Sequence, residues 1–367
     1  MKAALQPKPT EAPATSSPLQ LAREDLLRLE PYRHAAWEPS LERLHANELP
    51  WRPLGDNSRS GLNRYPEPQP RQLCEKLAAL YGVDKDQLLV GRGSDEGIDL
   101  LVRAFCRAGR DSVMISPPTF GMYAVAAHIQ GAGIVDVPLR LDTDFTLDIG
   151  QILDRWREVV KIVFVCSPNN PTGTLFAASE IERLCVELDG KALVAVDEAY
   201  LEFAQSPGVR GWLRRFPHLV VLRTLSKAFG LAGARCGTVL AHPDVIGLLR
   251  RMIPPYAIPS PTLEAALAAL ESPARVIAAR RVEEILAERQ RMASALTQSA
   301  AVQRVWPSAA NFLLVRFREV DRVYAAARAG GLLVRDVRGH PDLADCLRLT
   351  IGTPEQNDRL LAAVNTA

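Results

Sequence analysis

Short apolar runs alternate with amphipathic, helix-like segments from about residue 70 to 250 of the chain. Several of these runs are apolar throughout, rather than at every second position. Continuous apolar runs are typical of strands that are covered on both faces, so the pattern predicts a largely parallel α/β sheet. The runs lie within DQLLVGRGSDEGIDLLVRAFC, DSVMISPP, VKIVFVCSPNNPTG, KALVAVDEAY and HLVVLRTLSK.

Polar residues or glycines follow the carboxyl ends of four of these runs, at 91–96, 167–173, 197–200 and 224–227. Open α/β sheets bind ligands in the crevice outside the carboxyl ends of their strands. We therefore expect four segments that are distant in sequence to meet at one site.

A proline-bearing stretch, RMIPPYAIPSPTLEAALAAL, interrupts this alternation near residues 254–261, and we expect a domain boundary there. Beyond it, the pattern predicts a smaller α+β domain. Its expected elements are a long charged helix at about 274–298, a strand in NFLLVRF, a helix in VDRVYAAARAG, strands in GLLVRDV and LRLTIGT, and a final helix.

The first residues, MKAALQPKPTEAPATSSPLQ, are rich in Pro, Ala, Ser and Thr and lack the apolar core of a secretory signal. We expect a flexible tail at 1–30 and an arm at 31–55 that contributes to the small domain and to the edge of the expected site. A large domain at 56–255, which would hold most of that site, and a small domain at 256–367 would follow. No apolar run approaches the length of a bilayer, so we expect a soluble, cytoplasmic protein.

Composition narrows the class of protein without identifying it. The 367 residues are 47% hydrophobic and 23% charged, with a formal net charge of +2, which provides ample material for a large core. The basic residues are scattered, so we expect no nucleic-acid partner. The six cysteines have no C-x-x-C spacing and the six histidines are isolated, which predicts reduced core thiols and no metal site.

The loop VGRGSDEGIDLL follows a predicted strand and opens a predicted helix, with Ser94 and Asp95 at the expected cap positions. Free N–H groups at the start of a helix bind anions, and small residues let a phosphate approach. The loop matches neither a Walker A sequence nor G-x-G-x-x-G. On its own, a plain capped helix is therefore the better interpretation.

Three further features are candidates for chemistry. Asn169 and Asn170 lie in the tight turn SPNNPTG, which also reads as a simple strand-to-helix connection. Asp197 directly follows a buried strand, where a carboxylate needs a cation or a strong donor unless it only caps a helix. Lys227 lies between an apolar run and a glycine-rich segment, where burial would lower its pKa and make the amine a nucleophile toward an aldehyde.

Together with Arg235, these groups are the parts that a pyridoxal-phosphate site requires. At this point the sequence resembles the fold-type I aminotransferases, and more narrowly the histidinol-phosphate aminotransferases, from about residue 31 to the C-terminus. That resemblance implies a fold-type I α/β transferase with a large, mostly parallel-sheet cofactor domain. The motifs that carry it are LHANELP, LNRYPEPQP, RGSDEGIDLLVRAFC, PPTFGMY, CSPNNPTG, VDEAYLEF, RTLSKAFGLAGARCG, NFLL and LRLTIGT.

The resemblance implies a role for each matching residue at the cofactor. Lys227 would form a Schiff base with pyridoxal 5′-phosphate, Asp197 would pair with the ring nitrogen, and Phe120 would stack on the ring. Asn170 and Tyr200 would hydrogen-bond the ring O3′. The cofactor phosphate would be held by Ser94, Asp95, Thr224, Ser226 and Arg235, and by Tyr65 of the partner subunit in a homodimer. Family members commonly carry Tyr at position 120, so Phe120 retains stacking but no hydroxyl.

Substrate contacts would come from the small domain and the arm. In CLRLTIGT the alternation places Arg348 opposite the leucines, and by periodicity alone it is a solvated strand residue. The resemblance instead implies that Arg348 binds the carboxylate of glutamate or 2-oxoglutarate, and also the polar end of the amino-alcohol substrate. It also implies that Arg335, Tyr32 and Tyr65 meet the substrate phosphate, and that Asn47 lies on the arm that closes the site.

The implied reaction is a ping-pong transamination that interconverts L-histidinol phosphate plus 2-oxoglutarate with imidazole-acetol phosphate plus L-glutamate, in histidine biosynthesis. Three other interpretations stay open: an aromatic-amino-acid aminotransferase of the same family, a pyridoxal-phosphate-dependent threonine-phosphate decarboxylase, and a non-catalytic binding or regulatory protein. The presence of Lys227, Asp197, Asn170 and Arg348 together argues against the last of these.

Overall fold

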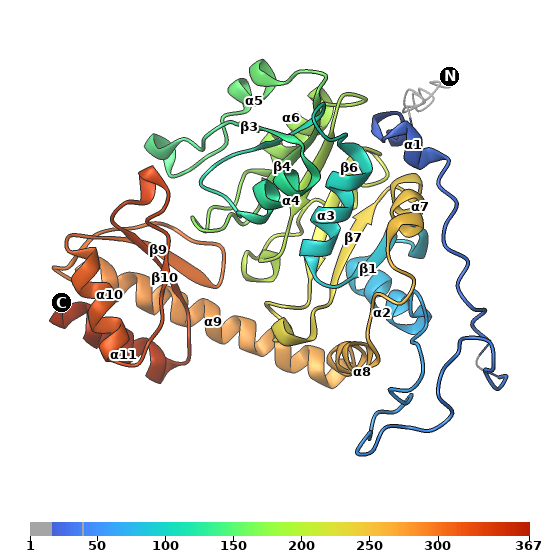
Figure 1. The fold of residues 1–367 in the computed structure, drawn as a ribbon. Coiled ribbons are helices and arrows are strands. Elements are labelled where there is room, and N and C mark those ends of the chain that lie inside the picture. The colour runs from blue at the N-terminus through green and yellow to red at the C-terminus, as the bar shows by residue number, and fades with distance from the viewer. Residues whose placement is uncertain (1–16, 39) are drawn as a thin grey trace, which may run out of the picture.

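The larger of two sheets organises the computed structural model, which describes residues 17–38 and 40–367 (Figure 1). Its seven strands have the order β1-β7-β6-β5-β4-β2-β3. Strands β3, β2, β4, β5 and β6 pair in parallel, and β7 runs antiparallel to both of its neighbours. The predicted α/β fold class is therefore confirmed. The strands are β1 Leu88–Gly91, β2 Ser112–Ile115, β3 Gly133–Asp136, β4 Val160–Cys166, β5 Leu193–Asp197, β6 Leu219–Thr224 and β7 Gly237–Ala241.

Helices cover both faces of this sheet, which explains why its central strands are apolar at most positions. On β4, Val163 and Val165 enter one buried cluster with residues of α2 and α6, whereas Ile162 and Phe164 enter another with residues of α3, α4 and α7. Successive side chains on a strand thus supply two separate cores. The helices are α2 Arg71–Tyr81, α3 Ser94–Phe105, α4 Met122–Gln130, α5 Ile149–Arg155, α6 Ala178–Glu187 and α7 Pro243–Met252.

The smaller sheet has four strands in the order β10-β11-β9-β8. The 27-residue helix α9 leads to it from the large sheet, after α8 (Figure 1). The strand predicted in GLLVRDV is reduced to two paired residues, and β8 was missed because only its first residue is buried. The elements are α8 Ser260–Ala269, α9 Ser272–Gln298, β8 Val302–Val305, β9 Phe312–Phe317, α10 Val320–Ala329, β10 Arg335–Asp336, β11 Cys346–Thr350 and α11 Pro354–Thr366.

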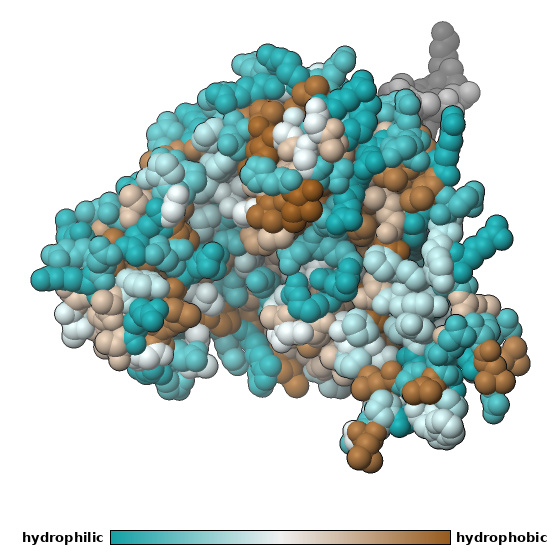
Figure 2. All heavy atoms as spheres, in the orientation of Figure 1, coloured by the Kyte–Doolittle hydropathy of each residue, from teal (hydrophilic) through white to brown (hydrophobic). Residues whose placement is uncertain are grey.

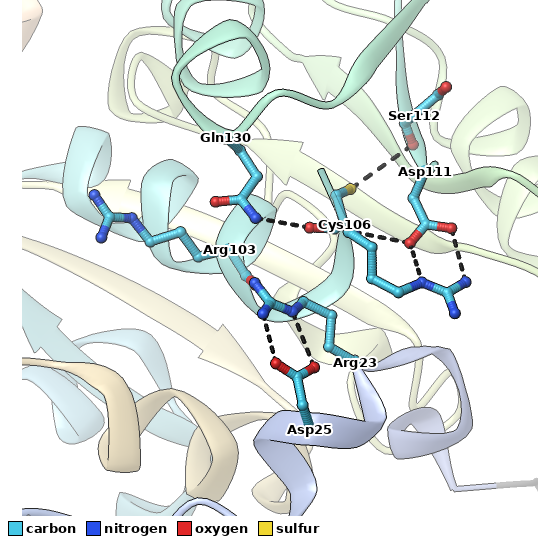
Figure 3. Close-up of polar contacts among 8 residues, drawn as sticks. Arg23, Asp25, Arg103, Cys106, Asp111, Ser112 and Gln130 are labelled. Carbon is cyan, nitrogen blue, oxygen red and sulfur yellow. Dashed lines mark hydrogen bonds and ion pairs between the residues drawn. The ribbon is translucent and has the colours of Figure 1, made fainter. Parts of the chain in front are cut away.

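The segment before residue 30 is partly packed, contrary to the prediction of a flexible tail. Residues 1–16 lie outside the described residues, but the next residues form a short 3₁₀-helix, Pro18–Leu21, and α1 Glu24–Leu27. Leu21 is buried, and the backbone N–H of Arg23 donates to the Ala104 carbonyl over 3.0 Å. The Arg23 side chain also donates to the Arg103 carbonyl over 3.2 Å (Figure 3). It thereby satisfies carbonyls in the last turn of α3, which have no partner within the helix.

The arm that follows projects from the large domain in an extended form, and its described residues, 31–38 and 40–55, form no helix or strand (Figure 1). Just after the arm, Arg59 donates from its backbone to Glu264 on α8 over 2.9 Å, and Tyr65 stacks on Tyr256 with ring centroids 4.5 Å apart. Both partners lie within 256–367, the range expected for the small domain.

The six cysteines are buried free thiols, which confirms the prediction of core thiols. Burial raises their pKa, for Cys106 and Cys185 to about 12. Among the helices that the structure describes, none is both long and apolar enough to cross a bilayer.

Candidate active site

The carboxyl ends of β1, β4, β5 and β6 meet at a cavity of 140 Å³. Asp197 is the last residue of β5, Thr224 is the last residue of β6, and Asn170 lies in the turn after β4. The four predicted segments are thus brought together at one edge of the sheet, as expected for parallel strands. The sequence-predicted residues that line the cavity are Ser94, Asp95, Phe120, Asn170, Asp197, Tyr200, Thr224, Ser226, Lys227 and Arg235.

Asp197 is 2% exposed and accepts two hydrogen bonds. The Tyr123 hydroxyl donates to Oδ2 over 2.9 Å, and the Ala199 N–H donates to Oδ1 over 3.1 Å. Burial raises the pKa of Asp197 to about 6, and both donors oppose that rise. A carboxylate in such surroundings strongly favours a cationic partner in the cavity.

Lys227 reaches solvent through the mouth of the cavity, yet protein groups surround its amine. The ammonium lies 5.4 Å from the centre of the Tyr200 ring. Burial within the cleft lowers the pKa of Lys227, and the charge of Arg348 lowers it further. More of the amine is therefore neutral near pH 7 than for a free lysine, which makes it a better nucleophile.

The start of α3 forms a cradle for an anion. Ser94 is the first residue of this 12-residue helix, and Gly93 precedes it with a φ of 93°. A Cβ at Gly93 would lie 2.6 Å from Arg235 Nη2, and one at Gly237 would lie 2.4 Å from the Ser94 nitrogen, so glycine is required at both positions. The Asp95 carboxylate accepts from Arg235 over 3.0 Å, so it orients the guanidinium and leaves the first-turn N–H groups to an anion.

Two hydroxyl groups complete this cradle. The Thr224 hydroxyl donates to Ser226 Oγ over 2.9 Å, and Arg235 Nη1 donates to the same oxygen over 3.4 Å. Arg235 has a φ of 56°, a conformation that costs a residue with a side chain about 1 kcal/mol. A cation, two hydroxyls and a helix start thus converge where the sheet ends.

A cleft of 760 Å³ between the two sheets adjoins this cavity and shares Asn170, Tyr200 and Lys227 with it. Arg348 donates to Asn170 Oδ1, and Asn170 Nδ2 donates to the Tyr200 hydroxyl over 3.4 Å. Arg335 lies on the neighbouring strand and also lines the cleft.

Arg348 is half-buried in this cleft, so its interpretation as a solvated strand residue from periodicity alone is wrong. Its Nε is enclosed and has no hydrogen-bond partner among the described residues. Its guanidinium lies 5.1 Å from the centre of the Phe312 ring. The arginine is therefore held in place by Asn170 and by the Phe312 ring.

Three predicted site residues lie outside this cavity and its cleft. Tyr32 lines a 750 Å³ cavity between the arm and α7, with Arg250 among its neighbours. Asn47 and Tyr65 line another cavity beside Ser260 at the start of α8. The described chain does not bring these three residues to Lys227.

Two residues near the cavity were missed or left without a role. Tyr123 lies in an apolar helical pattern, and the only signal in the sequence is that a buried hydroxyl needs a partner. Asn169 was noted only as a turn residue. It accepts from Thr119 Oγ1 over 3.0 Å and donates to the Pro118 carbonyl over 2.9 Å. It therefore fastens the loop that carries Phe120 to the turn that carries Asn170.

Comparison with known proteins agrees with this geometry. Residues 40–364 match the family described as aminotransferase class I and II. The chain belongs to this family. An aminotransferase of this kind is an enzyme, so the interpretation of the chain as a non-catalytic binding protein is not supported.

Curated relatives of this aminotransferase match it over nearly its whole length. It is 49% identical to the histidinol-phosphate aminotransferase of Xanthomonas euvesicatoria pv. vesicatoria (strain 85-10) over 96% of this chain and 98% of that protein. It is 48% identical to that of Stenotrophomonas maltophilia (strain R551-3), over 95% and 96%. The solved structure of histidinol-phosphate aminotransferase from Sinorhizobium meliloti, in complex with pyridoxal-5′-phosphate, aligns with a TM-score of 0.75 and 26% identity, over 83% of this chain and 82% of that one.

Proposed function

We propose that this aminotransferase interconverts L-histidinol phosphate plus 2-oxoglutarate with imidazole-acetol phosphate plus L-glutamate, as a step of histidine biosynthesis that uses pyridoxal 5′-phosphate. The observation that carries the proposal is one continuous space with three functions. An anion cradle lies at one end, Lys227 and Asp197 lie in the middle, and two arginines lie at the open end. The names of the curated relatives support the choice of substrates.

The residues of the cavity fit this cofactor. Its phosphate suits the cradle, since Arg235, Ser226 and the first turn of α3 all offer donors. Its ring nitrogen suits Asp197, the buried carboxylate that favours a cation. When bound, the cofactor withdraws electrons from the substrate carbon that loses a proton.

The chain's own residues then have separate tasks. Phe120 packs against the ring face, and Asn170 and Tyr200 donate or accept at its O3′. Lys227 Nζ takes the proton from the substrate's α-carbon and holds it, a task that a lysine of lowered pKa performs well near pH 7.

The two arginines explain how one cleft accepts two different substrates. Arg348 is fixed by Asn170 and binds the carboxylate of glutamate or 2-oxoglutarate. Arg335 lies farther out, where it meets the phosphate of the other substrate, with Tyr32 and Tyr65 of the partner subunit.

The arm supplies the argument for a homodimer with shared sites. Several of its apolar side chains are largely exposed, and Figure 2 shows hydrophobic groups along this projecting segment at the lower right. Exposed apolar residues gathered on one segment mark an interface. A second copy of the chain would cover them, with Tyr65 and Asn47 next to the partner's cavity. The residues are Tyr32 at 73% exposure, Leu44 at 92%, Leu49 at 70%, Trp51 at 77% and Leu54 at 106%.

The proposal also covers the division of the chain and its place in the cell. The large domain spans 56–255 and the small domain spans 256–367, with α9 as the connection. Six buried free thiols suit the reducing cytoplasm, where we propose that the enzyme works. We propose no nucleic-acid partner, since the basic residues are scattered.

The test is an absorbance titration of the pyridoxal-phosphate-loaded protein with L-histidinol phosphate and, separately, with L-phenylalanine. We expect histidinol phosphate to convert the yellow form at far lower concentration. Equal responses would make the enzyme an aromatic aminotransferase, and carbon dioxide release from threonine phosphate would make it a decarboxylase. Without a yellow band after pyridoxal phosphate is added, the cofactor assignment fails.

A further inference from the structure

Tyr123 is a buried residue of the large domain whose side chain contacts Asp197. It lies on α4, is 0% exposed, and donates its hydroxyl hydrogen to Asp197 Oδ2 over 2.9 Å. The two residues are 74 positions apart in the chain. This is a fully buried hydrogen bond to an ionisable group, which is a strong kind of contact.

The Tyr123 ring is held on two sides. It stacks on Phe164 with centroids 4.6 Å apart and an interplanar angle of 7°. Its edge meets Phe120 at 5.6 Å and 85°. The hydroxyl therefore has little freedom to leave Asp197. Tyr123 thus contacts both Phe120, which we propose packs on the cofactor ring, and Asp197, which we propose faces the ring nitrogen.

We propose that Tyr123 is a positioning residue that keeps Asp197 ionised and aims its free oxygen lone pairs at the cofactor's ring nitrogen. The proposal rests on the proposed function, because it needs a pyridine ring in the cavity. The apolar helical pattern around Tyr123 does not by itself predict this role.

The charges around Asp197 explain why the hydroxyl matters. Burial disfavours the charged form of the Asp197 carboxylate most, and the negative charges of Asp95 and Glu198 disfavour it further. Hydrogen bonds from Tyr123 and Ala199 are thus the chain's main means of stabilising the carboxylate.

Loss of the hydroxyl has a definite direction. Without it, the carboxylate becomes a stronger base, so the proton shared with the ring nitrogen moves toward Asp197. A hydrogen bond to a charged group is strong enough to change the proton affinity of its acceptor about ten-fold or more. The ring nitrogen would then be less protonated at a given pH.

The experiment uses Tyr123→Phe in the full-length protein loaded with pyridoxal phosphate that carries ¹⁵N in the ring. The ¹⁵N chemical shift reports protonation of the nitrogen, and a titration of cofactor-free protein gives its affinity. Tyr81→Phe is the matched control, because Tyr81 is also a buried tyrosine but packs on Arg223, at 5.1 Å from its ring centre. Asp197→Asn, alone and combined with Tyr123→Phe, completes a double-mutant cycle.

We expect Tyr123→Phe to move the ¹⁵N signal toward that of a neutral pyridine and to weaken cofactor binding about ten-fold or more. Tyr81→Phe should change neither. In the Asp197→Asn background, Tyr123→Phe should have no further effect. An unchanged ¹⁵N signal, or additive losses in the cycle, would overturn the role of Tyr123. Failure of the wild-type protein to bind the cofactor would instead overturn the proposed function, and the infrared carboxyl band of Asp197, assigned with Asp197→Asn, would still test whether Tyr123→Phe raises its pKa.

Discussion

Arg335 and Arg348 lie directly opposite each other on the antiparallel strands β10 and β11. Like charges at such positions destabilise a sheet. Burial lowers the pKa of Arg348, and the charge of Arg335 lowers it further. In the proposed function each arginine binds its own anion, Arg348 a carboxylate and Arg335 a phosphate, and these bound anions would offset the repulsion.

The two arginines should differ in what they bind. Arg335→Ala is expected to raise the KM for phosphate-bearing substrates by about 10- to 100-fold, because a charge-assisted contact is lost. The KM for glutamate should change far less. The measurement is steady-state kinetics of each half-reaction, with Arg322→Ala at an exposed ion pair as control. Equal losses for both substrates would contradict the assignment of Arg335.

Lys227→Ala should abolish turnover, with a loss of more than about 10³-fold, because both the nucleophile and the proton carrier are removed. The fold should survive, since the side chain reaches solvent, and the thermal unfolding temperature measures this. Lys191→Ala is the control, as Lys191 lies at the surface near Trp156. Substantial activity in the Lys227 variant would remove that residue from the reaction.

Gly93→Ala should reduce cofactor affinity by at least about ten-fold, since the added methyl group displaces Arg235 and strains a backbone with positive φ. Gly82→Ala is a matched control, because Gly82 has a φ of 65° but open space around its Cβ position. That variant should lose some stability and keep its affinity. If wild type and Gly93→Ala bind pyridoxal phosphate with similar affinity in a titration, the cradle does not hold the cofactor.

Asp197 should make the cofactor-free protein less stable as the pH rises. Its folded-state pKa of about 6 exceeds the ordinary value of 3.8, so folding favours the protonated form. Stability is then lost as the pH rises from about 4 to 6, by about 3 kcal/mol. Asp197→Asn should therefore match wild type below pH 4 and be more stable at pH 7, as measured by urea unfolding. If the free energy of unfolding of the two proteins depends on pH in the same way, the pKa of Asp197 is not raised by folding.

Shared active sites can be tested by mixing two inactive variants. If Tyr65 of the partner subunit completes the site around Lys227, as proposed, a dimer of one Lys227→Ala chain and one Tyr65→Ala chain contains a single intact site. Activity should therefore return when the two variants are unfolded and refolded together, but not when each is refolded alone. No recovery, or sedimentation as a 40.2 kDa monomer, would contradict the dimer.

The sequence allows much of the cofactor cavity to be predicted, because the topology of parallel strands brings their carboxyl ends together. Asp197, Asn170 and Thr224 each lie next to such an end, and they line one cavity. Periodicity fails for Arg348, however, since a strand pattern cannot tell a face exposed to solvent from a face turned toward another domain. Residues that face solvent and residues that face a ligand cleft between domains are both polar, so they give the same sequence pattern.

Other parts of the site depend on contacts that have no local signal. Tyr123 is one aromatic residue among several apolar positions on α4, and its partner is 74 residues away. Tyr32 and Asn47 lie on the arm and Tyr65 lies just after it, in a stretch with little regular structure, so no pattern fixes their positions. The antiparallel direction of β7 is equally invisible, because its residues are as apolar as those of its neighbours.

The position of β1 in the sheet has a consequence for synthesis of the protein. This strand leads directly into the cradle at Ser94, but its partner in the sheet is β7, whose residues follow roughly 150 positions later. At about 5–20 residues per second, the ribosome takes on the order of 10–30 s to deliver them. During that interval the edge of β1 that β7 will cover has no strand partner and is open to wrong ones. β6 ends only about a dozen positions before β7 begins, so its second partner follows almost at once. The part of the sheet beside the cradle is thus completed late in synthesis.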